Sequence, residues 1–214
     1  LLKLLESTLS ANIKKTIFGL YESTAISQQG KEILYQLWSN KKTIDNLFLN
    51  ENDFTKLAMV LAIYEHPKAS EILEQQAKNI TNQDRLARFK WLLPSLSADE
   101  KVRDSFMKSL LKKENRENES WVEVALNNLH HPLRQKSSVK HLKSVLEKLE
   151  EVQLTGDIFF PKGWLASSIG NYSSKEAYKI LQDFLNENPK YNPILLKKLQ
   201  QTTDNLNRAQ SIKK

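Results

Sequence analysis

Apolar residues recur every three or four positions along almost the whole chain, and this spacing is the strongest constraint on its fold. A period near 3.6 gives a helix one apolar stripe, whereas the alternation typical of strands is almost missing here. The sequence therefore predicts an all-α protein whose helices are stable only when they pack on one another. Three clear series are Leu57, Val60, Leu61 and Tyr64; Val139, Leu142, Leu146 and Leu149; and Ala177, Ile180, Leu181, Phe184 and Leu185.

Residues that start and stop helices divide this pattern into segments. Prolines predict helix ends, because proline has no backbone N–H to donate, and four pairs have the spacing of a capping box. The pairs are Thr81 with Asp84, Ser97 with Glu100, Ser120 with Glu123 and Ser173 with Glu176; the stops are Pro67, Pro94, Pro132 and Pro189. The predicted helices cover residues 2–10, 12–26, 29–39, 53–65, 68–79, 82–93, 98–111, 120–131, 137–154, 158–169, 174–187 and 192–210.

The predicted loops are short, which favours antiparallel packing of helices that follow one another in the chain. We therefore expect an α-solenoid of antiparallel helical hairpins, similar to HEAT or armadillo repeats, in a single domain over residues 1–214. A compact irregular helical bundle is the alternative. The chain begins with LLKLLESTLS, whose leucines already have helical spacing, so we expect it to be a domain of a longer protein.

Composition restricts the partners and the chemistry. The 32 basic and 25 acidic residues give a net charge of +7, which can attract nucleic acid, anionic lipid or acidic peptides. The lysines are scattered at helix-surface spacing, however, and this indicates a solvated surface. Apolar runs such as IFGLY are far shorter than the roughly 18 residues of a membrane span. The absence of cysteine excludes disulfides, thiolate metal sites and cysteine nucleophiles.

The histidines do not have the spacing of a catalytic zinc site, which needs two of them one helical turn apart with a glutamate beside the first. His130 and His131 are adjacent and would point about 100° apart on a helix. His66 precedes a proline, and His141 stands alone on a lysine-rich helix. A glycine-rich phosphate loop and a GxSxG elbow are also missing, so we predict no catalytic centre.

The stretch TGDIFFPKGWLASSIG, residues 155–170, contains three of the five glycines and three large aromatic side chains. We expect Gly156 to end the preceding helix in a left-handed conformation and Asp157 to cap the next one. Phe159, Phe160 and Trp164 would then anchor a short helix against its neighbours.

Three segments together resemble a known family. TNQDRLARFKWLLPSLSADEKVRD (81–104), NRENESWVEVALNNLHHPLRQKSS (115–138) and EVQLTGDIFFPKGWL (151–165) are similar to the C-terminal helical domain of zinc aminopeptidases of the aminopeptidase N type. The resemblance covers essentially the whole chain and implies HEAT-like hairpins that follow a thermolysin-like catalytic domain. The HExxH zinc motif and the Gly-Ala-Met-Glu-Asn type segment of that family do not occur here. The resemblance therefore implies a noncatalytic domain without a cofactor of its own, zinc being bound by the parent enzyme's catalytic domain.

The resemblance also implies partners: the catalytic domain of the same chain, over which this domain would close, and the peptide substrates whose access it would control. Arginine can hold a peptide carboxylate with two hydrogen bonds, so Arg85, Arg88 and Arg134 are candidate peptide contacts. Pairing with local acids or helix ends is the alternative for each. Phe160 and Trp164 are candidates for docking to the catalytic domain, with a place in the core as the alternative.

A standalone α-solenoid that binds nucleic acid or an acidic protein partner is the competing function. Nucleic-acid binding requires basic residues gathered on one surface. A domain of an aminopeptidase predicts dispersed basic residues and an exposed apolar patch where the catalytic domain packs. We expect no nucleic acid and no membrane segment.

Overall fold

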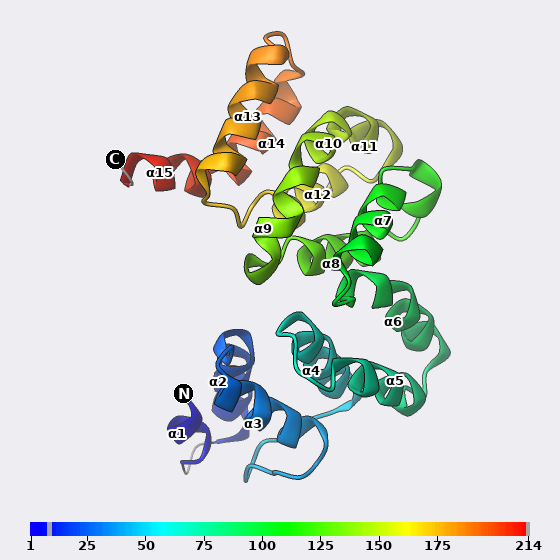
Figure 1. Cartoon of the computed structure of the whole chain (residues 1–214), viewed down its shortest axis with the longest axis vertical. Helices are drawn as coiled ribbons and strands as arrows, with labels where there is room; N and C mark the ends of the chain where they lie inside the picture. The colour runs from blue at the N-terminus through cyan, green and yellow to red at the C-terminus, as the bar shows by residue number, and fades with distance from the viewer. Residues whose placement is uncertain (8–9, 213–214) are drawn as a thin grey trace. The chain divides into compact units, whose positions relative to one another are not determined.

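The computed structural model describes residues 1–7 and 10–212. These residues are helical or lie in short turns and loops, with no strand in either range (Figure 1). The predicted all-α class is therefore confirmed. The sequence predicts one domain over residues 1–214, whereas the contacts divide the chain into two compact units, Leu1–Leu93 and Pro94–Lys214. Each unit is described by itself.

The first unit is organised around α4, which packs on α2, α3 and α5, while α1 packs on α2. Its core includes the fully buried leucines Leu34, Leu57 and Leu61, all at positions that the apolar periodicity selects. The last helix, α6, begins in the first unit and ends in the second. The helices are α1 (Leu2–Leu5), α2 (Ala11–Thr24), α3 (Gln28–Trp38), α4 (Glu51–Ile63), α5 (Ala69–Asn79) and α6 (Gln83–Leu96).

Side-chain caps and left-handed residues set the ends of α3 and α4. Asn50 and Asp53 form a complete capping box at the start of α4. Asn40 (φ 56°) and Glu65 (φ 55°) follow the last turns of α3 and α4 in the left-handed conformation, which closes a helix end by satisfying its free carbonyls. The sequence analysis did not mark this capping box, because its cap is an asparagine and not a serine or threonine.

The second unit contains the remaining helices. They are α7 (Glu100–Leu110), η1 (Lys113–Asn115), α8 (Glu119–Leu129), η2 (Pro132–Arg134), α9 (Gln135–Ser138), η3 (Val139–His141), α10 (Leu142–Glu147), α11 (Leu149–Thr155), α12 (Phe160–Ser168), α13 (Lys175–Glu187), α14 (Pro193–Thr202) and α15 (Asp204–Ile212). Helix α12 is central, since it packs on α8, α10, α11 and α14, and α13 packs on α10 and α15. Trp164 of α12 is the largest fully buried side chain of the protein's described part.

Several predicted boundaries are wrong. The predicted helix 137–154 is divided into α9, η3, α10 and α11, and the predicted helix 192–210 is divided at Thr203. Pro94 lies inside α6 instead of ending it. It occupies the last turn, so its missing N–H removes one helical hydrogen bond, to the carbonyl of the exposed Lys90. Of the predicted helix 2–10, α1 forms Leu2–Leu5, and residues 8 and 9 lie outside the described residues.

The predicted caps are displaced by one or more residues. The side chains that accept the first-turn N–H groups belong to Asn82, Asp99 and Ser174, each one or two positions after the predicted hydroxyl. At α8 the cap position is Asn118, and its side chain accepts no capping bond from the described residues. The predicted serines and threonine had suitable spacing, but the neighbouring Asn, Asp and Ser residues are equally good N-caps.

Gly156 also differs from its prediction. Its backbone is extended (φ −110°, ψ 178°), so a left-handed conformation is not the reason for a glycine here. A Cβ atom at this position would lie 2.6 Å from Cδ1 of Phe160 and 2.8 Å from Oε1 of Glu119. The glycine therefore makes room for two side chains that pack against the turn.

Candidate functional site

Histidine and acidic side chains form no metal site in residues 1–7 and 10–212, where no group of three or more possible ligands is arranged to hold an ion. His66 and His130 are buried. His131 caps the short η2 helix by accepting from the N–H of Leu133. His141 is held by Asp104, 2.7 Å from its Nε2 atom.

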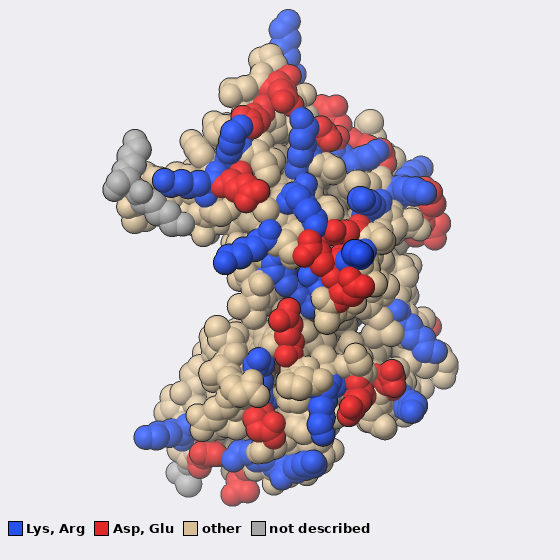
Figure 2. Space-filling model, in the orientation of Figure 1, with Lys and Arg blue, Asp and Glu red and all other residues tan. Residues whose placement is uncertain are grey.

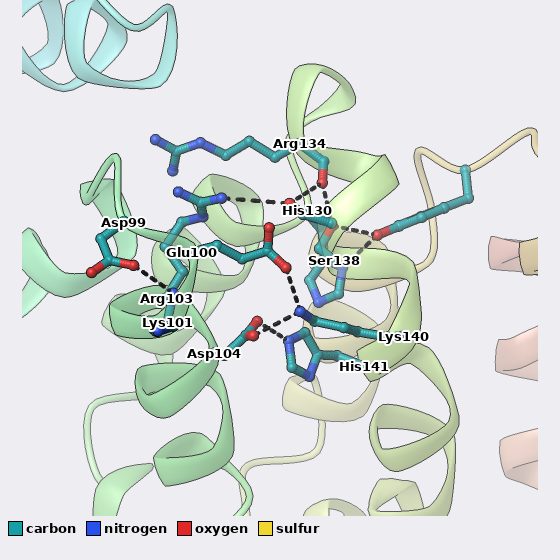
Figure 3. A network of polar contacts seen from close by, with 12 residues as sticks. Asp99, Glu100, Lys101, Arg103, Asp104, His130, Arg134, Ser138, Lys140 and His141 are labelled. Carbon is teal, nitrogen blue, oxygen red and sulfur yellow. Dashed lines mark hydrogen bonds and ion pairs between the residues drawn. The ribbon is translucent and has the colours of Figure 1, made fainter.

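Asp104, Glu100, Lys140 and His141 form a charged cluster between α7 and η3 (Figure 3). The ammonium of Lys140 lies 2.7 Å from a carboxylate oxygen of Asp104 and also contacts Glu100. Partial burial opposes ionisation of Asp104, but hydrogen bonds from Lys140 and His141 lower its pKa. Because a lysine occupies the space between the carboxylates, we interpret the cluster as an ion-pair link between two helical segments and not as a metal site.

A second polar chain runs through the core of the same unit (Figure 3). Nδ1 of His130 lies 2.8 Å from the hydroxyl of Tyr172, which lies 2.7 Å from Oγ of Ser138. Ser138 donates to the carbonyl of Arg134 at 3.0 Å. Nε2 of His130 has no hydrogen-bond partner in the described structure. If Nδ1 of His130 carries the proton, it donates to Tyr172, the hydroxyl of Tyr172 donates to Ser138, and Ser138 donates to the carbonyl of Arg134. Each N–H and O–H of the chain then has an acceptor, and Nε2 of His130 is an unprotonated acceptor without a donor among the described residues.

Arg134 is 3 % exposed and lies inside the second unit. One of its terminal nitrogens donates to the carbonyl of Ser95 at 2.7 Å, and the other donates to that of Leu96 at 3.1 Å. These carbonyls lie at the C-terminus of α6, where a helix leaves acceptors without partners. Arg134 therefore binds a helix end. The sequence analysis gave this role as the alternative to a peptide contact.

Arg103 and Arg116 also donate to backbone carbonyls, and the sequence did not single them out. One terminal nitrogen of Arg103 donates to the carbonyls of Ser97 and Ala98 at 2.7 and 2.8 Å, in the linker between α6 and α7. Arg116 donates to the carbonyl of Leu110 at the end of α7 at 3.1 Å, and its other terminal nitrogen lies 2.6 Å from Glu151. Both guanidinium groups thus bind acceptors of the protein in place of solvent.

The two candidate arginines of α6 differ in their surroundings. Arg85 is paired with Glu51 at 3.2 Å, and Glu51 also accepts two hydrogen bonds from Thr81. The bonds from Thr81 are the main reason that the pKa of Glu51 is lowered, and Arg85 adds to them. Arg88 is exposed and forms no ion pair or hydrogen bond with the described residues. Of the three candidates, Arg88 is the one whose guanidinium is available to a ligand.

Phe160 and Trp164 both lie in the core of the second unit, at 2 % and 0 % exposure. Their rings make an edge-to-face contact, and the indole N–H donates to the carbonyl of Val145 at 3.0 Å. Neither ring is accessible to a second protein without opening the core. The prediction that Phe159 anchors the helix as well is wrong, because its side chain is 78 % exposed.

Phe159 belongs to an apolar patch, which we define as Leu154, Ile158, Phe159 and Ile194. Their side chains are between 65 % and 85 % exposed, although large apolar side chains are usually covered. The patch joins the end of α11, the turn before α12 and the start of α14. Lys198, one helical turn after Ile194, donates to the carbonyl of Ile158 at 3.2 Å, which brings α14 to this turn.

Comparisons with protein-family models, curated proteins and solved structures find no match to this chain. Across the described ranges, the structure has no helix with both the length and the apolar character of a bilayer span. The similarity to aminopeptidase domains is thus an interpretation of the sequence alone.

Sequence reasoning missed the apolar patch because it assigned the aromatic residues of TGDIFFPKGW as one group. Period 3.6 places Phe160 and Trp164 on one helix face and Phe159 on another. Counting helical turns back from Trp164 would have assigned Phe160 to the buried face and Phe159 to a different face. The contribution of Ile194, which lies 35 positions after Phe159 in the chain, could not be read from local spacing.

Proposed function

We propose that this chain is a noncatalytic domain of a zinc metallo-aminopeptidase, which closes over the catalytic domain and controls the access of peptides to the active-site cavity. The proposal rests on the three segments whose sequences resemble that domain. The observation that carries it furthest is the order in which the helices of the second unit pack.

Two series of helices run through the second unit. Helix α8 packs on α12 and α12 packs on α14, while α10 packs on α13 and α13 packs on α15; the contacts of α10 with α12 and of α14 with α15 join the series. The two series correspond to the rows of equivalent helices in stacked hairpins, and the consecutive helices α14 and α15 are also in contact. The pattern supports an α-solenoid of the HEAT type over an irregular bundle.

The distribution of charge favours this function over nucleic-acid binding. On the face drawn in Figure 2, lysine and arginine side chains are interspersed with aspartate and glutamate. Many are paired locally, as Lys179 is with Asp183 and Arg208 is with Asp204. A nucleic-acid groove instead collects basic side chains that have no acidic neighbours.

Arg88 is the residue that we propose as a peptide contact. Its guanidinium is exposed on α6 and is not used by the described fold. A peptide carboxylate could accept two parallel hydrogen bonds from it. Arg134 cannot take this role without releasing the end of α6.

The proposal is tested on the protein encoded by the complete reading frame that contains this chain. We expect zinc-dependent release of amino-terminal residues, and a loss of discrimination between short and long peptides when residues 1–214 are deleted. Arg88→Ala should raise KM for peptides and leave KM for an aminoacyl-coumarin unchanged, whereas the matched Arg208→Ala should change neither. A reading frame without an HExxH motif, or peptide discrimination that survives the deletion, would refute the proposal.

A further inference from the structure

We infer that the apolar patch of Leu154, Ile158, Phe159 and Ile194 is a docking surface for a protein segment whose apolar side chains are bordered by carboxylates. The inference concerns the place and the chemistry of a contact, and it holds whether or not the partner is a peptidase domain. Three properties of the patch carry it: its exposure, the rigidity of the turn that presents it, and the charges around it.

The exposed side chains come from three elements that lie close together, since α12 packs on both α11 and α14. Leu154 lies in the last turn of α11, Ile158 and Phe159 precede α12, and Ile194 lies in the first turn of α14. Single exposed apolar residues are common on proteins, but several on neighbouring elements mark an interaction site. Phe159 is the kind of large aromatic side chain that dominates the binding energy of protein interfaces.

The turn that carries Ile158 and Phe159 is held by hydrogen bonds at successive residues. The N–H of Asp157 donates to Glu119 at 2.7 Å, and the N–H of Phe159 donates to the side chain of Asp157 at 2.9 Å. The carbonyl of Ile158 accepts from Lys198, and the carbonyl of Phe159 accepts from two N–H groups of α12 at 3.1 and 3.2 Å. A turn fixed in this way loses little conformational entropy when a partner binds.

The charges around the patch select the partner. Lys162 lies one helical turn after Phe159, and Lys197 and Lys198 lie one turn after Ile194. None of the three forms an ion pair within the described ranges, whereas the nearby carboxylates of Asp157 and Glu119 are engaged by backbone N–H groups. Lysines without acidic partners at the border of an apolar surface are complementary to a partner with acidic residues around an apolar centre.

The same charges disfavour other occupants. A second copy of this chain on a two-fold axis would place the lysines of one patch beside those of the other. Single-stranded nucleic acid needs several aromatic platforms for its bases, and Phe159 is the one aromatic member of the patch.

The test measures binding of the whole 214-residue chain to two synthetic helical peptides. Both carry leucine at positions i, i+3, i+4 and i+7, and the remaining positions are glutamate-rich in one peptide and lysine-rich in the other. We expect the glutamate peptide to bind at least tenfold more tightly and to shift the amide resonances of residues 154–163 and 194–198. Phe159→Ser and Lys162→Ala/Lys197→Ala/Lys198→Ala should each weaken binding at least tenfold. Phe48→Ser, which replaces a 76 % exposed phenylalanine of the first unit, should leave it unchanged.

Other results would overturn the inference. These are equal affinity for the two peptides, affinity that Phe159→Ser does not reduce, or Phe159-dependent binding only to phosphatidylserine vesicles or to DNA. Self-association in sedimentation that Phe159→Ser abolishes, without peptide binding, would assign the patch to a second copy instead. Because Phe159 is exposed, its variant should keep the melting temperature of the wild type. Failure here leaves the peptidase proposal intact, since that proposal is tested by hydrolysis.

Discussion

Nδ1 of His130 and the hydroxyl of Tyr172 lie 2.8 Å apart in the core of the second unit. Burial disfavours a charged imidazole and lowers the pKa of His130 to about 3, with a smaller contribution from His141. Burial also raises the pKa of Tyr172, so its hydroxyl keeps its proton. The pair is thus neutral at physiological pH.

This pair predicts a specific loss of stability in acid. The unfolded chain takes up a proton at His130 below about pH 6.5 and the folded chain does not until about pH 3, so stability falls as the pH is lowered through this window. His130→Phe should be less stable than the wild type at pH 7, because Tyr172 loses its partner. The difference in free energy of unfolding between the wild type and His130→Phe should narrow by up to about 1.4 kcal/mol per pH unit below 6.5. Native-state hydrogen exchange of α8 and α12 measures this difference. A difference that does not change with pH would contradict a neutral, buried His130.

Arginine and lysine at position 134 should differ in the stability that they give to the second unit. Arg134→Lys keeps the charge but cannot reach the carbonyls of both Ser95 and Leu96 as a planar fork does. We expect Arg134→Lys and Arg134→Met to lower the free energy of unfolding of the second unit by about 2–4 kcal/mol. Arg88→Met, on the exposed face of α6, should change it by less than about 0.5 kcal/mol. Urea denaturation measures all three, and a fully stable Arg134→Lys would show that the fork is dispensable.

Replacing Trp164 should destabilise the protein far more than replacing Phe159. Trp164→Ala removes a buried indole and its bond to Val145, so a loss of about 3–5 kcal/mol is expected. Phe159→Ala should change stability by less than about 0.5 kcal/mol. Thermal unfolding measures both variants, and similar losses would mean that Phe159 is covered by the protein's own structure.

The effect of Gly163→Ala on stability should depend on the side chain of Glu123. A Cβ at Gly163 would lie 1.7 Å from Oε1 of Glu123, at the movable end of that side chain. Gly163→Ala should therefore destabilise the protein alone, but become neutral or stabilising by about 0.5–1 kcal/mol in a Glu123→Ala background. At Gly30 a Cβ would lie 2.7 Å from the backbone carbonyl of Ala25, which cannot move aside. Gly30→Ala should thus destabilise in both backgrounds, and a double-mutant cycle distinguishes the two sites.

Helical periodicity was sufficient to predict the class and the position of most helices. It failed where tertiary contacts decide a boundary. Helix α6 continues past Pro94 to Leu96, and Arg134, 40 positions after the proline, binds the carbonyls at this helix end. A similar long-range effect explains Gly156, whose space is occupied by Glu119 of another helix. No local pattern contains either contact.

The candidate site was harder to predict, because it depends on which way each side chain faces. Arg88 and Arg134 are both arginines, yet Arg88 is exposed and Arg134 is buried. The adjacent phenylalanines Phe159 and Phe160 are 78 % and 2 % exposed. Burial of a charged group depends on the acceptors that surround it, and those acceptors come from segments far away in the sequence.

The three interior guanidinium groups of Arg103, Arg116 and Arg134 also bear on surface engineering of this protein. A redesign that lowers the pI or adds acidic residues to improve solubility would normally treat every arginine as a replaceable solvent-facing site. Here these three belong with the leucines of the core, and formal charge counted from the sequence overstates the cationic surface that a chromatography resin or a polyanion can reach. Exposed lysines without an ion pair or hydrogen bond in the described structure are the safer positions to recode.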